Sequence, residues 1–115
     1  MTKITHLDLS SSALLWKEER QLDSVCKFIK RQQILKTLNL SGNNFTSDTT
    51  GRIFLTLIEC SSLATLKEVN LDYSADFSSM TTCENFADFI ETTPSLKRCF
   101  VENQDHAEIQ VSVSF

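Results

Sequence analysis

The chain has 115 residues, enough for one domain, and 41% of them are hydrophobic and 23% charged, an ordinary balance for a globular protein. The formal net charge of -4 argues against general nucleic-acid binding, because phosphate contacts need clustered basic residues. No apolar run approaches the roughly 20 residues that span a bilayer, so we expect no membrane insertion.

The four cysteines are scattered along the chain and form no C-x-x-C pair. We therefore expect no metal site, no redox motif and no cofactor. The cysteines are instead predicted to be small buried hydrophobes, namely Cys26, Cys60, Cys83 and Cys99. Residues 1–3 lead directly into the first apolar pattern without a targeting segment, so we expect a cytoplasmic protein.

Residues 35–45 read L-x-x-L-x-L-x-x-N-x-F, and the same spacing of three apolar residues begins at residues 4, 66 and 96. The steps between these starts are 31, 31 and 30 residues. A nearly constant step indicates structural repeats, whereas the alternative is four unrelated strands that happen to be evenly spaced. The predicted core ladder is Ile4, Leu7, Leu9, Leu35, Leu38, Leu40, Leu66, Val69, Leu71, Leu96, Cys99 and Val101.

Each of the first three repeats is predicted to hold a short strand and then a helix. Repeat one has a strand near 6–9 and a helix from about 16 or 17 to 31. Its apolar residues at i, i+3, i+4 and i+7 are Leu22, Val25, Cys26 and Ile29. Repeat two has a strand at 37–40 and a helix from about 49 to 60. Ser47 or Asp48 is its expected N-cap.

Repeat three is predicted to have a strand at 68–71, a loop with one extra residue and a helix over about 79–92. Its predicted buried residues are Cys83, Phe86 and Ile90, with Phe89 as a further candidate. Repeat four is a strand near 98–102, followed by a polar turn at 103–106. Residues 109–115 alternate between apolar and polar, which predicts an antiparallel strand over about 108–115 that caps the open sheet edge.

This pattern resembles the leucine-rich repeat. The long step resembles the helix-bearing subclass of ribonuclease inhibitor and the Ran GTPase-activating protein. The resemblance covers about residues 4–102 and concerns scaffold positions. It implies one α/β domain over 1–115, a short solenoid of about four parallel strands. Three helices would lie on its convex side, with repeats starting near 4, 35, 66 and 96. Asn43 holds the family's turn position, where the other repeats have Ser12, Ser74 and Gln104, so looser turns are expected in repeats one and three.

The resemblance also implies that a protein partner binds on the concave sheet face. Lysines would line one margin of that face and acidic residues the other, with amides and an aromatic residue between them; the alternative is a solvated face without a partner. The predicted contact residues are Lys36, Lys67, Lys97, Thr37, Glu68, Arg98, Asn39, Asn70, Phe100, Asp72 and Glu102.

A second hypothesis places the contact at the end of the array before the first strand, which has no predicted cap. Three consecutive apolar residues stand beside that end: Leu14, Leu15 and Trp16. If they were exposed, the chain could be a subunit of a larger assembly or a self-associating module. The alternative is that Trp16 covers the first helix.

We expect no enzymatic activity. His6 and Asp8 point the same way in the predicted strand, but no nucleophile, metal-ligand spacing or glycine-rich phosphate loop accompanies them. A GTPase-activating role would need a catalytic arginine on a repeat loop, and no arginine occupies a family motif position.

Overall fold

The computed structural model describes residues 4–12, 14–102 and 112–114, with the backbone alone described for residues 14, 15 and 112–114. The elements in chain order are β1 (His6–Asp8), α1 (Leu14–Lys17), α2 (Glu19–Arg31), β2 (Thr37–Asn39), α3 (Ser47–Ile58), β3 (Glu68–Asn70), α4 (Met80–Thr92), β4 (Arg98–Phe100) and β5 (Ser112–Ser114). Within these ranges, no helix combines the length and the apolar character that crossing a bilayer requires.

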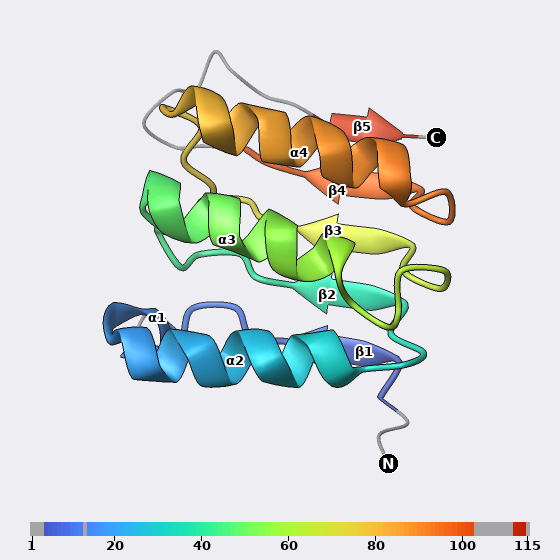
Figure 1. The fold of residues 1–115 in the computed structure, drawn as a ribbon, viewed down its shortest axis with the longest axis horizontal. Coiled ribbons are helices and arrows are strands. Elements are labelled where there is room, and N and C mark those ends of the chain that lie inside the picture. Colours follow the sequence, from blue (N-terminus) through green and yellow to red (C-terminus); the bar gives the residue numbers. More distant parts are fainter. Residues whose placement is uncertain (1–3, 13, 103–111, 115) are drawn as a thin grey trace.

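One sheet organises the chain, with the strand order β1-β2-β3-β4-β5. The first four strands are parallel, and α2, α3 and α4 lie side by side on one face of the sheet (Figure 1). The predicted mixed α/β class with four parallel strands and three helices is confirmed. β5 pairs antiparallel with β4, with Cys99 opposite Val113. The rest of the predicted 108–115 strand lies outside the described residues.

The pairing register reproduces the sequence steps. His6 lies opposite Thr37, Thr37 opposite Glu68, and Glu68 opposite Arg98. Positions that are equivalent in sequence therefore occupy neighbouring rungs of the sheet. The central strand positions Leu38, Val69 and Cys99 are at most 1% exposed, because alternation along each strand turns them toward the helices.

The first row of the core is less covered than the others. Leu7 is half-buried, whereas its neighbour Leu38 is 1% exposed. Ile4 and Leu9 are also half-buried, while their equivalents Leu35 and Leu40 are 0% exposed. Among the described residues β1 pairs with β2 alone, so apolar surface stays open at this end of the sheet.

The turn after each strand has the same backbone conformation at equivalent positions. Ser11, Gly42 and Tyr73 stand 31 residues apart and have φ values of 49°, 70° and 58°. A side chain at Gly42 would be strained by this φ, and its Cβ would come within 2.9 Å of Ser11 Oγ. Glycine is therefore required where the middle turn stacks on its neighbour.

Asn43 joins the turns of repeats one and two. Its Oδ1 accepts the Ser12 N–H at 2.6 Å, and its Nδ2 donates to the carbonyls of Leu9 at 3.0 Å and Leu40 at 2.9 Å. Ser74 performs an equivalent task in repeat three: its Oγ accepts the Asn43 N–H at 2.7 Å and donates to Leu40 O at 2.5 Å. The expectation of a looser third turn is wrong, because the Ser74 hydroxyl both donates and accepts.

Two helix starts differ from the sequence prediction. The first helix is broken at Glu18, which has an extended backbone (φ -102°, ψ 134°), so the short α1 precedes α2. The N-cap of α3 is Thr46 rather than Ser47 or Asp48, because the Thr46 Oγ1 accepts the Thr49 N–H at 3.2 Å.

The rotation of α4 also differs from the prediction. Cys83 was expected in the core but is exposed, whereas Phe89 is 0% exposed and Thr82 3% exposed. Phe89 packs against Phe54 with ring centroids 5.8 Å apart. A Cβ at Gly51 would lie 3.2 Å from Thr82 Oγ1, so the small residue lets α3 and α4 approach closely. This close approach turns Thr82 rather than Cys83 toward α3.

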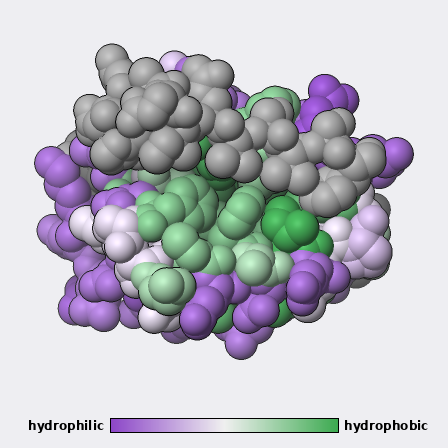
Figure 2. Space-filling view, turned by 90° about the horizontal axis from the view of Figure 1, so that it is seen from above, coloured by the Kyte–Doolittle hydropathy of each residue, from purple (hydrophilic) through white to green (hydrophobic). Residues whose placement is uncertain are grey.

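The side of α4 that faces away from α3 carries apolar residues. Met80, Cys83 and Ala87 are exposed, and Phe86 and Ile90 are half-buried. Figure 2 looks onto this end of the molecule, where apolar side chains gather in the centre and polar ones surround them on the lower side. Both ends of the helix row therefore present apolar surface.

We expect Asn43→Asp to lower the free energy of unfolding by about 2–3 kcal/mol, because a carboxylate cannot donate to the Leu9 and Leu40 carbonyls and the site is 4% exposed. Asn44→Asp is the matched control, because Asn44 is exposed and Asp tolerates its φ of 51°. Chemical denaturation of the three proteins measures the difference. Equal losses in both variants would contradict this role for Asn43.

We expect one of the four thiols to react rapidly with a thiol reagent in the folded protein. Cys83 is exposed, whereas Cys26, Cys60 and Cys99 are buried, and burial raises the pKa of the Cys99 thiol to about 12. Mass spectrometry after brief labelling should find the modification at Cys83, and Cys83→Ser should remove the fast phase. Rapid labelling of Cys99 without denaturant would contradict the packing described above.

Candidate functional site

The sheet face opposite the three long helices carries the outward side chains of β1 to β4 (Figure 1). These side chains are exposed or half-buried, and they alternate with the buried core positions. We call this surface the open sheet face. Its strand residues are His6, Asp8, Thr37, Asn39, Glu68, Asn70, Arg98 and Phe100.

Two lateral contacts join neighbouring strands on the open sheet face. His6 Nδ1 lies 2.5 Å from Thr37 Oγ1, and Arg98 Nε lies 3.5 Å from Glu68 Oε1. The Asp8 carboxylate accepts the Ser10 N–H at 2.9 Å, and this hydrogen bonding lowers the Asp8 pKa. His6 and Asp8, which point the same way in the sequence prediction, therefore engage different partners.

The next column of the face supports the turns that follow the strands. The Oδ1 atoms of Asp8, Asn39 and Asn70 accept backbone N–H groups two residues further on, at 2.9, 3.0 and 2.9 Å. These side chains thereby stabilise their own turns. The oxygens of Asn39 and Asn70 are thus used within the repeat, whereas each side-chain NH₂ can still donate to a ligand on the face.

The predicted lysine row forms one margin of the face. Lys67 N donates to Lys36 O at 2.8 Å, and Lys97 N donates to Lys67 O at 2.7 Å, so the three lysines stand on successive rungs. The rungs of a sheet are about 4.8 Å apart. All three lysine side chains are exposed, so they present a row of positive charge along this margin.

The predicted acidic row forms the other margin, and part of it is structural. Asp72 Oδ1 accepts the Glu102 N–H at 2.7 Å, which ties the end of β4 to the preceding turn. Tyr73 stands beside this pair and is 46% exposed. The Glu102 and Asp72 carboxylates raise the Tyr73 pKa, because they disfavour a phenolate. Its place in a loop gave no signal for Tyr73 in the sequence.

A shallow depression of about 280 Å³ lies in the part of the face formed by β1, β2 and β3. Polar residues line it, with Leu7 and Leu38 at its floor. The structure thus brings Thr37, Asn39, Glu68 and Asn70 together around one recess. Lys97 and Phe100 belong to β4 or the residue before it and lie outside the recess.

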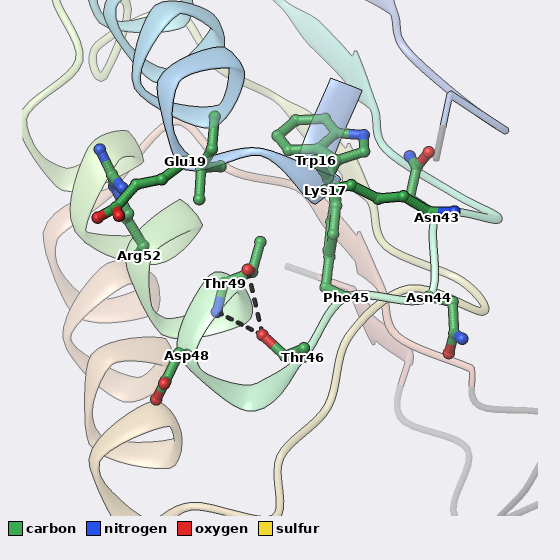
Figure 3. A pocket seen from close by; sticks show the side chains of 11 residues that line it. Trp16, Lys17, Glu19, Asn43, Asn44, Phe45, Thr46, Asp48, Thr49 and Arg52 are labelled. Atoms are coloured by element: carbon green, nitrogen blue, oxygen red, sulfur yellow. Dashed lines mark hydrogen bonds between the residues drawn. The ribbon is translucent and has the colours of Figure 1, made fainter. Parts of the chain in front are cut away.

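A larger hollow of about 720 Å³ lies between the N-terminal ends of α2 and α3 and was not anticipated from the sequence. In Figure 3, Trp16 and Phe45 stand on one side of it and Glu19 and Arg52 on the other. Its lining mixes acidic and basic side chains, and Arg52 forms an ion pair with Asp23. This mixture indicates no preference for an anionic or a cationic ligand.

Trp16 was considered as an exposed residue of an end interface, and that expectation is wrong. Its side chain is 8% exposed and packs edge-to-face on Phe45, with ring centroids 4.7 Å apart. The break at Glu18 leaves α1 as a separate turn that carries the indole over the core. The side chains of Leu14 and Leu15 lie outside the described part of the chain.

The part of the chain that the structure describes holds no group of three or more His, Cys, Asp or Glu residues able to bind a metal ion. We compared the chain with protein-family models, with curated proteins and with solved structures, and none of them matched.

We expect Glu102→Gln to lower the Tyr73 pKa toward its ordinary value, because the substitution removes the largest of the listed carboxylate influences without changing side-chain size. The chain has one tyrosine, so phenolate absorbance during a pH titration reports Tyr73 alone. Glu84→Gln on exposed α4 should leave the titration unchanged. An unaltered midpoint in Glu102→Gln would contradict the arrangement at this margin.

Proposed function

We propose that this chain is a short leucine-rich-repeat solenoid of the long, helix-bearing kind and that it binds a protein partner through the open sheet face. The repeat assignment is supported by the match between the sequence step and the pairing register. It is also supported by the recurrence of one turn conformation every 31 residues. In this assignment the face with α2, α3 and α4 is convex, the open sheet face is concave and β5 caps the sheet.

The observation that carries the binding proposal is a polar sheet face left uncovered by the helices. Its strands are locked in register by backbone pairing, so binding would fix few additional backbone torsions. A surface ordered in advance loses less conformational entropy when it meets a partner. The rows of lysines and carboxylates on opposite margins would orient that partner, since opposite charges steer association.

The centre of the face supplies contacts of a different kind. The amide groups of Asn39 and Asn70 can donate hydrogen bonds, and half-buried Phe100 can act as an aromatic anchor on β4. A partner with an acidic segment toward the lysine row and polar groups toward the amides would match this arrangement. The mixed-charge hollow beside Trp16 lacks such a regular pattern.

We expect Lys36→Glu/Lys67→Glu to weaken partner binding at least about tenfold, because reversing two neighbouring charges introduces repulsion where attraction is proposed. Capture with the wild-type chain from its native source identifies the partner, and titration of the purified partner gives each affinity. Both lysine side chains are exposed, so the melting temperature should change little.

The matched control is Lys17→Glu/Arg20→Glu, which makes the same charge change at exposed positions near the start of α2. The control should bind as the wild type does. Equal affinities of the two double variants, or equal losses, would contradict binding through the open sheet face. Asp72 is left unaltered because its carboxylate accepts the Glu102 N–H.

A further inference from the structure

The two outer helices of the row differ in charge. The sequence of α2 contains four basic and two acidic residues, whereas that of α4 contains three acidic residues and no basic one. Figure 1 places α2 and α4 at opposite ends of the row, with α3 between them. The molecule therefore has one end rich in positive charge and one end rich in negative charge.

The packing of α2 on α3 indicates which side of α2 is outward. Lys30 pairs with Glu59 at 2.8 Å and Asp23 pairs with Arg52, so these residues of α2 face α3. Phe28 is two positions beyond buried Cys26, which places it about 200° around the helix and on the opposite side. Phe28 is 41% exposed, and the exposed residues Lys27 and Arg31 flank it toward solvent.

The outward side of α4 follows in the same way. Thr82 bonds to Ser47 and Asn85 to Gly51, so these two residues face α3. Ala87 lies about 160° from Asn85, averaged turn geometry being 100° per residue, and is therefore on the far side with Met80 and Cys83. Met80 is 75% exposed, and Glu84 and Glu91 stand beside this stripe on exposed positions.

We propose that two copies of this chain associate head to tail, with the outward side of α2 from one copy packed on the outward side of α4 from the other. Phe28 would contact the stripe formed by Met80, Cys83 and Ala87. Lys27 and Arg31 would stand opposite Glu84 and Glu91. Within one chain, α2 and α3 already use this arrangement, an apolar contact flanked by ion pairs.

Charge complementarity selects a second copy as the occupant, since each copy offers both halves of the contact. The contact is heterologous, because the two copies contribute different surfaces. The sheet does not continue through β4, whose outer edge is paired with β5, so the helices make the contact. A contact centred on one helix from each copy is small, and we expect dissociation constants on the order of 10–100 µM.

Sedimentation velocity of the full chain over roughly 10–500 µM tests the proposal, since association of this strength changes the populations in that range. The sedimentation coefficient should rise with concentration and rise less at high salt. Ala87→Arg and Phe28→Asp should each remain monomeric. Thr81→Arg is the matched control, because exposed Thr81 points toward solvent rather than along the row, and it should associate like the wild type.

A mixture of the two defective variants gives the sharper test. Ala87→Arg retains an intact α2 surface and Phe28→Asp retains an intact α4 surface, so an equimolar mixture should form dimers and stop there. If Phe28→Asp lowers the melting temperature, Arg31→Glu replaces it and should weaken association about tenfold. A wild-type chain that stays monomeric, or a mixture without dimers, would overturn the proposal and leave the face to a different occupant.

This inference does not rest on the proposed function. Lys36→Glu/Lys67→Glu alters the open sheet face and should leave self-association unchanged, while Ala87→Arg should leave capture of a partner through the sheet unchanged. The two variants therefore separate failure of one proposal from failure of the other.

Discussion

The fold depends on the stacking of equivalent aliphatic residues on adjacent rungs of the sheet. Leu7, Leu38, Val69 and Cys99 follow one another across β1 to β4, and their backbones are paired in a register equal to the sequence step. A slip of one residue would turn every core side chain of a strand toward solvent. The same constraint aligns the polar positions between them, so the order of the open sheet face is a consequence of core packing.

Polar contacts between turns complete what the aliphatic ladder begins. Backbone groups in the turns cannot all pair with strands, and an unpaired buried group is costly. Asn43 satisfies such groups in two turns, and Ser74 does so in the next with a shorter side chain. At the other end of the strands, Ser62 Oγ accepts the Leu35 N–H at 2.9 Å and Thr65 Oγ1 donates to Leu35 O at 2.8 Å. Small hydroxyl residues thus take over positions that a consensus pattern would give to an amide.

The strands, their order in the sheet and their buried residues could be predicted from the sequence, because the 31-residue step depends on backbone pairing that repeats without change. Helix rotation could not be predicted in the same way. Cys83 and Phe89 both fit an apolar stripe on α4, and the close approach at Gly51 decides which one is buried. The exposure of Trp16 was mispredicted because it depends on Phe45, which is distant in sequence. The hollow between α2 and α3 likewise depends on contacts between separate helices. The binding residues remain a prediction, since periodicity places them on one face without naming what they contact.

The pairing of β5 with β4 also bears on how such an array could lengthen during evolution. A unit added beyond β4 would have to displace β5 from the only edge where it pairs among the described residues. A unit duplicated between β2 and β3 would instead meet neighbours of its own kind on both sides. Growth of this architecture therefore favours internal duplication over extension at its C-terminal edge.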